Sequence, residues 1–214
     1  MRSQFFSAKP SLKICGVTTK EDALSLVEMG VDALGFNFWP KSKRYCSPEA
    51  VEKIAPPLSG KILRVGVFVN NARDLAQELF QKDLIDVIQL HGDESIDEVE
   101  HFLSLNIPVI RALSALNLPQ NPLPQSNFAL LIDTPAGQDY GGTGKTFDWS
   151  LAQDFSLSRP ETPIILAGGI TPENAERALL ETHPIALDVA SGAEISPGIK
   201  DLKKVRSLME IVSQ

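Results

Sequence analysis

The sequence is poor in the residues that build disulfide frameworks and metal centres. Its 214 residues include two cysteines and three histidines, and neither a CxxC nor an HExxH motif occurs. Two cysteines cannot form a disulfide framework for a chain of this length, and zinc sites need clustered cysteine or histidine ligands. We therefore expect neither a disulfide framework nor a bound metal.

Long apolar runs and long basic runs are missing as well. No stretch approaches the roughly 20 apolar residues that cross a bilayer, and residues 1–10 lack the apolar core of a secretory signal. The formal net charge is −7, from 20 lysines and arginines against 27 aspartates and glutamates. Nucleic-acid binding needs a basic surface. We therefore expect a cytoplasmic protein whose partners include neither a membrane nor a nucleic acid.

What is present is the composition of an ordinary folded domain. Hydrophobic residues make up 43% of the chain and charged residues 22%, which excludes a disordered or fibrous protein. The length exceeds the usual domain size of about 150 residues only moderately. Because no long break in composition divides the chain, we predict one domain over residues 1–214.

Short apolar segments rich in β-branched residues recur along the chain. Their near-continuous valine, isoleucine and leucine content is typical of strands that are buried on both faces of a parallel sheet. Parallel strands need crossover connections, which are usually helices. The eight predicted strands are residues 12–17, 31–38, 62–69, 86–91, 107–112, 128–133, 163–167 and 186–190.

Amphipathic segments with capping residues separate most of these strands. The exception is the connection between the fifth and sixth strands, where Pro119, Pro122 and Pro124 cannot sustain a helix. The seven predicted helices cover residues 20–29, a segment that starts at 48, and residues 72–82, 94–104, 149–155, 172–181 and 201–212.

Eight such units predict an α/β fold of the (β/α)8 TIM-barrel type, with the helix between strands 5 and 6 replaced by a Pro-rich loop. A doubly wound open sheet is the alternative. Such a sheet usually has five or six strands and a GxGxxG motif after the first one. The segment Cys15-Gly16-Val17-Thr18 at the end of the first predicted strand does not supply this motif, so we favour the barrel.

Polar residues at the ends of the predicted strands are the candidates for chemistry, because barrel enzymes carry their catalytic groups there. Cys15 ends the first strand and is either a small core residue or a thiolate that acts as base or nucleophile. Asp133 closes the apolar sixth strand and either caps the next loop or donates a proton. Gln89 and His91 end the fourth strand on one side and are either satisfied core groups or substrate ligands.

Three loops add candidates for anion binding and closure. Arg44 follows the second strand and is either solvated or a bidentate ligand for a carboxylate. Gly168-Gly169 and Ser191-Gly192 follow the seventh and eighth strands, as in the phosphate site of many barrels. Residues 139–146 end like a nucleotide-binding P-loop but begin with Asp139 where glycine is required. We interpret them as a cover over the site.

Seven short motifs occur in order between Lys13 and about Asp201. They are KICG at 13–16, GFNF at 35–38 leading to SKRY at 42–45, VGVFV at 65–69, QLHGDE at 89–94, GGTG at 141–144 with FDW at 147–149, LAGGI at 166–170 and DVASG at 188–192. Together they resemble the phosphoribosylanthranilate isomerase family of tryptophan biosynthesis.

The resemblance implies a (β/α)8 isomerase that converts N-(5-phosphoribosyl)anthranilate into 1-(2-carboxyphenylamino)-1-deoxyribulose 5-phosphate by an Amadori rearrangement, without a cofactor. Matched residue by residue, it implies Cys15 as general base, Asp133 as general acid and Arg44 as ligand of the anthranilate carboxylate. The other implied site residues are Gln89, His91 and Asp188 for the substrate and Gly168, Gly169, Ala190, Ser191 and Gly192 for its phosphate. Lys13 and Arg111 are further cations available to a substrate with several negative charges.

Three other interpretations stay open at this point. The related isomerase of histidine biosynthesis needs a second glycine-rich phosphate turn, whereas the loops after the third and fourth strands offer one glycine and two carboxylates. A non-catalytic phosphate-binding barrel would not need both Cys15 and Asp133. The third is a structural partner in an assembly of tryptophan-pathway enzymes, and contacts with those enzymes are an open prediction.

Overall fold

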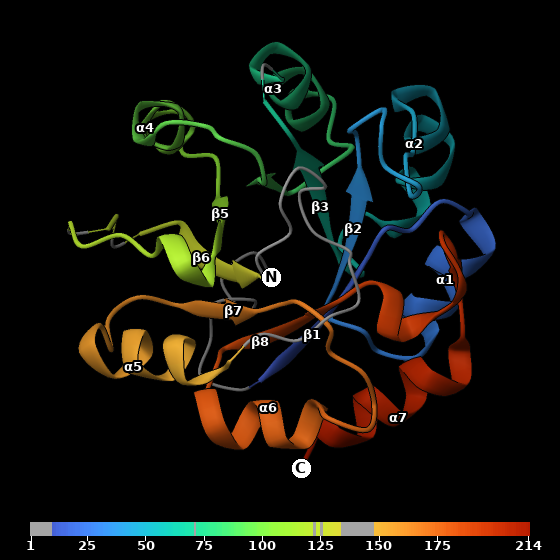
Figure 1. Cartoon of the computed structure of the whole chain (residues 1–214). Helices are drawn as coiled ribbons and strands as arrows, with labels where there is room; N and C mark the ends of the chain where they lie inside the picture. Colours follow the sequence, from blue (N-terminus) through green and yellow to red (C-terminus); the bar gives the residue numbers. More distant parts are fainter. Residues whose placement is uncertain (1–9, 71, 122, 125, 134–147) are drawn as a thin grey trace.

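A computed structural model describes residues 10–70, 72–121, 123–124, 126–133 and 148–214. Eight parallel strands close into a barrel in the order in which they occur in the chain, with helices around the outside (Figure 1). The strands are β1 (Ser11–Cys15), β2 (Ala33–Asn37), β3 (Leu63–Phe68), β4 (Val87–Leu90), β5 (Val109–Ser114), β6 (Phe128–Asp133), β7 (Ile164–Leu166) and β8 (Ala186–Val189). The predicted TIM barrel is confirmed.

Three of the described helices, α1, α2 and α7, begin at a capping side chain. Thr19, Ser47 and Asp201 each accept a hydrogen bond from a backbone N–H of the first turn of the helix that follows. The helices are α1 (Lys20–Glu28), α2 (Pro48–Ile54), α3 (Arg73–Gln81), α4 (Ile96–Ser104), α5 (Ser150–Ser158), α6 (Ala175–Thr182) and α7 (Leu202–Val212). Within the described residues, none of them is long and apolar enough to cross a membrane.

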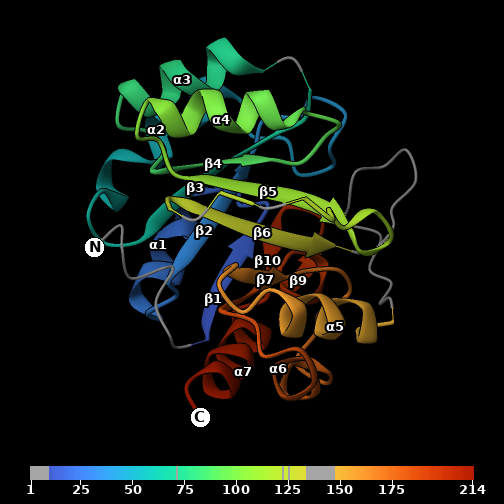
Figure 2. The same cartoon turned by 90° about the vertical axis from the view of Figure 1, so that its left-hand side faces the viewer.

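The connection between β5 and β6 lacks an α-helix among its described residues, as predicted. It contains only a short 3-10 turn, η2 (Ala115–Asn117), before the chain returns to Phe128. β5 and β6 nevertheless run side by side in the same direction (Figure 2). The Pro-rich loop therefore replaces the crossover helix without disturbing the barrel.

A two-stranded hairpin that the sequence did not predict follows β8. It consists of β9 (Glu194–Ser196) and β10 (Ile199–Lys200), paired antiparallel after the 3-10 turn η4 (Ser191–Ala193). Thr18 Oγ1 donates to the Gly198 carbonyl at 2.8 Å, which ties the hairpin to the loop between β1 and α1. The hairpin thus lies beside the C-terminal end of β1.

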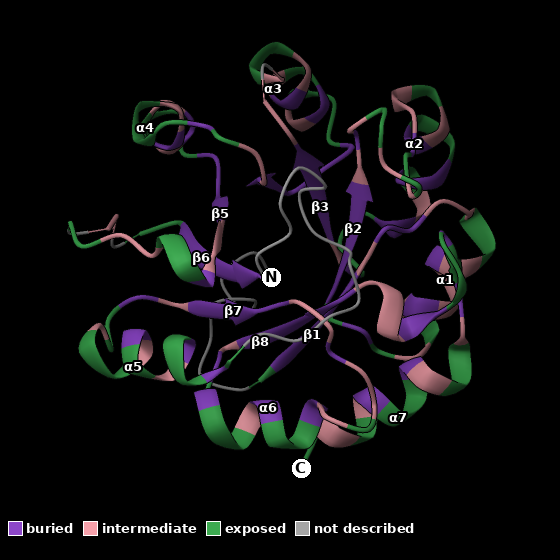
Figure 3. Ribbon diagram, viewed as in Figure 1, coloured by how far each residue is buried: buried purple, intermediate pink, exposed green. Residues whose placement is uncertain are grey.

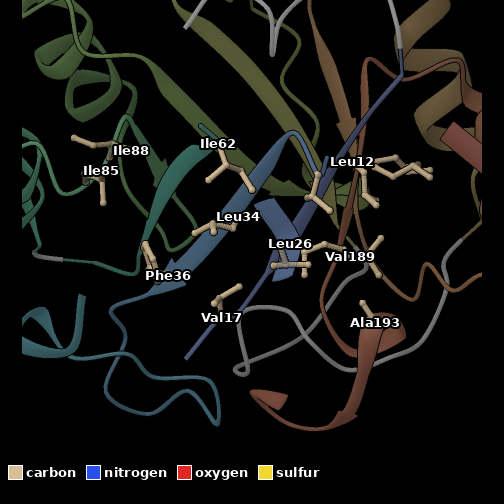
Figure 4. Close-up of a cluster of buried hydrophobic side chains, with 14 of the residues drawn as sticks. Leu12, Val17, Leu26, Leu34, Phe36, Ile62, Ile85, Ile88, Val189 and Ala193 are labelled. Atoms are coloured by element: carbon tan, nitrogen blue, oxygen red, sulfur yellow. The ribbon is translucent and has the colours of Figure 1, made fainter. Parts of the chain in front are cut away.

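The core has two layers separated by the strands. Leu12 and Leu34 point outward from β1 and β2 and belong to the same buried cluster as Leu26 of α1 (Figure 4). The strands and the inward faces of the helices are buried, and the outward faces of the helices are exposed (Figure 3). The inner layer fills the barrel with small and branched residues: Ala33, Val65, Val87, Ile110, Ala112, Ala129, Leu131, Ile165, Ala167 and Ala186.

Candidate active site

The interior of the barrel becomes polar at the C-terminal ends of its strands. Successive residues of a strand point to opposite sides, so Lys13 and Cys15 share the inner face with Ala33. The register pairs Lys13 with Asp188 of β8, and Cys15 with Gly35 of β2. The fold therefore brings a cation, a thiol and a carboxylate to one place from two neighbouring strands.

Lys13 is buried and joins these groups. Its Nζ lies 2.7 Å from Asp188 Oδ1, and its charge acts on the neighbouring Cys15 thiol. A Cβ on Gly35 would lie 2.9 Å from Cys15 Sγ and 3.3 Å from Lys13 Nζ, so glycine leaves room for both groups. Burial raises the pKa of the Cys15 thiol above its ordinary value, although the positive charges of Lys13 and Lys200 oppose that rise. Burial lowers the pKa of Lys13, but the charges of Asp188 and Cys15 and the hydrogen bond to Asp188 together outweigh it and raise the pKa above its ordinary value.

The opposite wall carries Asp133 at the end of β6. His91 Nε2 lies 3.3 Å from Asp133 Oδ2, and Gln89 Nε2 lies 2.8 Å from His91 Nδ1. When the Gln89 amide nitrogen donates to Nδ1, the imidazole proton is on Nε2 and faces Asp133. Gln89 is buried, and its Oε1 has no hydrogen-bond partner within the described part of the chain. The structure thus brings the three predicted residues together in one row.

Arg44 reaches the site from the loop between β2 and α2. Its Nε lies 2.9 Å from Glu194 Oε1 and 3.1 Å from Oε2, and its Nη2 lies 2.7 Å from Oε2. Gly16 has a φ of +73°, and a Cβ there would overlap the Arg44 side chain. The sequence analysis missed Glu194. The available signal was an acidic and a basic residue, Glu194 and Lys200, in the short segment after the turn at Ser191.

The turns after β7 and β8 adjoin each other. Gly168 and Gly169 have φ values of 85° and 65°, which favour glycine. Asn174 closes this turn, because its side chain accepts from a backbone N–H at 2.8 Å and donates to the Gly169 carbonyl at 2.9 Å. A Cβ on Gly192 would overlap the Ile170 carbonyl oxygen, so the two turns touch. The predicted phosphate residues Gly168, Gly169, Ala190, Ser191 and Gly192 all lie in these two turns.

Arg111 does not serve as the substrate cation that the sequence analysis offered. Its Nη1 donates to the Leu90 carbonyl at 3.0 Å and to Glu94 Oε2 at 2.9 Å, and its Nη2 donates to the carbonyls of Gly92 and Glu94 at 3.0 Å. Burial lowers the pKa of this guanidinium, and the charge of Glu94 opposes the change. Arg111 instead fixes the loop between β4 and α4, which carries His91.

Two further expectations concern the same end of the barrel. The predicted cover, residues 139–146, lies outside the described residues. In the described part of the chain, no group of three or more histidine, cysteine, aspartate or glutamate side chains is placed to hold a metal ion.

Comparisons with known proteins identify the family. Residues 12–211 match the family model described as N-(5'phosphoribosyl)anthranilate (PRA) isomerase. The chain is 43% identical over 201 residues to N-(5'-phosphoribosyl)anthranilate isomerase of Thermotoga neapolitana. This match covers 93% of this chain and 96% of that protein. The crystal structure of phosphoribosyl anthranilate isomerase from Thermotoga maritima matches with a TM-score of 0.82 and 38% identity, covering 95% of this chain and 98% of that one.

A solved structure with a bound ligand also matches. It is phosphoribosyl anthranilate isomerase in complex with reduced 1-(o-carboxyphenylamino)-1-deoxyribulose 5-phosphate, and its TM-score is 0.78 at 34% identity. The match covers 95% of this chain and 98% of that chain.

Proposed function

Because this chain belongs to the N-(5'-phosphoribosyl)anthranilate isomerase family, we propose that the polar cluster at the C-terminal strand ends is its active site, with Asp133 as general acid and Cys15 as general base. The chain is an isomerase of tryptophan biosynthesis, and it converts N-(5-phosphoribosyl)anthranilate into 1-(2-carboxyphenylamino)-1-deoxyribulose 5-phosphate. The observation that carries the assignment is the placement of the two groups. Each ends a strand on the inner face of the barrel, Cys15 beside the buried Lys13 and Asp133 at 3.3 Å from the half-buried His91.

The first step is ring opening. Asp133 donates its proton to the furanose ring oxygen, the bond between that oxygen and C1′ breaks, and the anthranilate nitrogen shares the resulting positive charge as an iminium. His91 contacts the Asp133 carboxyl at 3.3 Å and is itself held by Gln89. Both residues therefore orient the acid in this proposal.

The second step moves protons on carbon. The Cys15 thiolate removes the proton from C2′, and the electron pair of that C–H bond neutralises the iminium to give an enolamine. The new thiol then returns a proton to C1′ while the 2′-hydroxyl gives its proton to the Asp133 carboxylate, which forms the ketone and restores both groups. Lys13 favours the thiolate through its charge, and Asp188 holds Lys13 in place.

The substrate is anionic at both ends, and the site has a matching group for each end. Arg44 takes the anthranilate carboxylate, because a guanidinium can bind a carboxylate through two parallel hydrogen bonds. The adjoining turns after β7 and β8 take the phosphate through their backbone N–H groups. No cofactor enters the scheme, since the iminium nitrogen accepts the electrons.

The proposal places the reaction in the cytoplasm, where a reducing environment keeps the Cys15 thiol free. It includes no membrane and no nucleic-acid partner. Contacts with other tryptophan-pathway enzymes stay a prediction, which co-purification of the chain with those enzymes from its own host would test.

The roles of Cys15 and Asp133 are tested by replacing them singly with Ala and Asn. We expect kcat to fall by about 10²- to 10⁴-fold in each variant, the range typical of removing a positioned acid or base. Turnover is followed by the loss of substrate fluorescence, and circular dichroism checks that the barrel is intact. Cys46→Ser is the matched control, because Cys46 is a buried free thiol that the mechanism does not use. Turnover near that of the unaltered protein in either variant would remove that residue from its role.

A further inference from the structure

A buried carboxylate, Glu194, lies at the centre of an ion cluster beside the proposed carboxylate ligand. It accepts hydrogen bonds from Arg44 Nε and Nη2, from Lys200 Nζ at 2.7 Å and from the Gly198 backbone N–H at 3.1 Å. Glu194 and Lys200 are almost wholly buried, and Arg44 is largely so. One carboxylate thus links the loop after β2 to both strands of the hairpin.

These contacts fix which edge of the Arg44 guanidinium is available. Glu194 occupies the side edge, formed by Nε and one Nη2 hydrogen. The end edge, formed by Nη1 and the second Nη2 hydrogen, has no hydrogen bond within the described residues. The stem of Arg44 lies against Gly16, where there is no room for a Cβ. A planar guanidinium held on one edge and along its stem presents its other edge in a fixed direction, which suits a second carboxylate.

The same cluster is tied to the proposed base. Lys200 Nζ donates to the backbone carbonyl of Cys15 at 2.6 Å as well as to Glu194. Glu194 and Lys200 therefore connect Arg44 to the backbone of Cys15. These contacts fix the position of a carboxylate bound at Arg44 relative to Cys15.

The cluster contains two cations, Arg44 and Lys200, and one carboxylate, Glu194, so it lacks one negative charge. Burial raises the pKa of Glu194, but the hydrogen bonds from Arg44 and the charge of Lys200 lower it by more than burial raises it. The pKa of Glu194 therefore lies below its ordinary value. Burial lowers the pKa of Lys200, and the neighbouring Glu194 carboxylate opposes that change. Two cations thus share one anion, and a substrate carboxylate would balance the second cation.

We propose that Glu194 is a positioning residue that orients Arg44 for the anthranilate carboxylate. This inference rests on the proposed role of Arg44. Glu194 acts through Arg44 and makes no contact with the substrate. Its removal should therefore change how the site distinguishes a ligand with the carboxylate from one without it, and it should do so only while Arg44 is present.

The test measures the affinity of two ligands by calorimetry. One is reduced 1-(o-carboxyphenylamino)-1-deoxyribulose 5-phosphate, and the other is the same compound without its carboxylate. We divide the dissociation constant of the ligand without the carboxylate by that of the ligand with it. This ratio measures how much Arg44 gains from binding the carboxylate. We expect this ratio to fall by about tenfold or more in Glu194→Gln and in Arg44→Ala, the size of effect that a charge-assisted bidentate contact supports. We expect Glu194→Gln to change the ratio by less than about twofold when Arg44 is already alanine.

Three outcomes would overturn the inference. A ratio unchanged in Glu194→Gln would show that Arg44 does not need this carboxylate. A ratio raised in Glu194→Gln would show that Glu194 competes with the substrate instead of positioning its ligand. A ratio unchanged in Arg44→Ala would remove Arg44 as the carboxylate ligand, and the role of Glu194 would fall with it.

A second buried pair at the same end of the barrel provides a matched control. Glu94 accepts from Arg111 as Glu194 does from Arg44, but it has no contact with the clamp. We expect Glu94→Gln to lower the thermal stability while the ratio for the two ligands stays within about twofold. If Glu194→Gln does not fold, Glu194→Gln combined with Lys200→Met removes the second buried cation as well, and the same ratio is measured in that protein.

Discussion

The Cys15 thiol combines burial with two nearby cations, and this combination makes its ionisation measurable. Burial raises its pKa above the ordinary 9.0, while Lys13 and Lys200 oppose the rise. Because only the thiolate reacts with an alkylating agent, we expect the alkylation rate of the ligand-free protein to rise with pH to a midpoint above 9.0. Lys13→Met removes an opposing charge and leaves Asp188 near the thiol, so this variant should move the midpoint further up.

The measurement uses a Cys46→Ser background. Burial raises the pKa of Cys46 to about 11, so its alkylation would otherwise overlap the upper part of the curve. Lys20→Met is the control, since Lys20 is an exposed lysine at the start of α1. A midpoint below 9.0, or one that Lys13→Met leaves in place, would contradict the electrostatic account of this site.

Sequence reasoning located single residues where strand position alone decides their place. Cys15 and Asp133 each end an apolar run, and the alternation of a strand directs both into the barrel. Arg111 also lies on a strand, but its guanidinium turns into the loop after β4, whose carbonyls and Glu94 satisfy it. Glu194 could not be predicted, because its role depends on contact with Arg44, which lies 150 positions earlier in the chain.

At the scale of elements, two helices were predicted to start a few residues before they do, because the residues at the predicted start close a loop instead. The segment predicted from residue 94 becomes helical at Ile96, because Glu94 instead accepts from the Asn70 and Gly92 backbone N–H groups. The segment predicted from residue 172 becomes helical at Ala175, because Asn174 closes the turn before it. The periodicity of the sequence does not distinguish residues that bind the backbone of a preceding loop from residues of the first turn of a helix. The β9–β10 hairpin escaped prediction because its strands have three and two residues.

The contact between the turns after β7 and β8 makes a prediction for Gly192→Ala. The added Cβ would overlap the Ile170 carbonyl oxygen and lie 3.1 Å from Thr171 Cα, so the two turns must move apart. Since backbone N–H groups from both turns bind the phosphate in our proposal, we expect KM for the substrate to rise by about tenfold or more. Competitive inhibition by inorganic phosphate should weaken in parallel, and steady-state kinetics measure both effects.

Gly66→Ala is the control for crowding alone. A Cβ on Gly66 of β3 would lie 2.7 Å from a ring carbon of Phe68 and 2.9 Å from Ile85, on the outer face of the barrel. We expect it to lower thermal stability without weakening inhibition by phosphate. Phosphate inhibition that is equally strong in Gly192→Ala and in the unaltered protein would separate these turns from phosphate binding.

At the scale of the whole molecule, the two ends of the barrel differ in how their buried charges are balanced. Around Cys15 at the C-terminal end, the ion pairs of the described residues join three cations, Lys13, Arg44 and Lys200, to two carboxylates, Asp188 and Glu194, while Arg111 is paired separately with Glu94. This local excess of positive charge suits an anionic substrate in a chain whose net charge is −7. At the N-terminal end, the one buried cation of the described residues, Arg64, faces two carboxylates, Asp83 and Asp86, and is fully paired.

Arg64 therefore allows stability to be separated from catalysis. Its Nε and Nη2 bind Asp86 at 2.9 and 3.0 Å, and the Asp86 carboxylate also accepts from the Arg64 backbone N–H at 3.0 Å. Asp86→Ala leaves a buried guanidinium with only the largely exposed Asp83 side chain as a counter-charge, and we expect the free energy of unfolding to fall by about 3 kcal/mol. Asp83→Asn removes a carboxylate charge that is 58% exposed and keeps a residue type that tolerates the φ of 53° at this position, so it should cost less than about 1 kcal/mol.

Denaturant unfolding gives both stabilities, and kcat/KM is measured well below the unfolding transition of each variant. Because Asp86 lies at the start of β4 and the proposed active site at the other end of the barrel, we expect kcat/KM of folded Asp86→Ala to stay within about twofold of that of the unaltered protein. A larger loss of kcat/KM, with the variant still folded, would mean that strain at the N-terminal end reaches Cys15 and Asp133 through the strands. The layered packing of the barrel interior predicts that the two ends are independent, and this result would contradict that prediction.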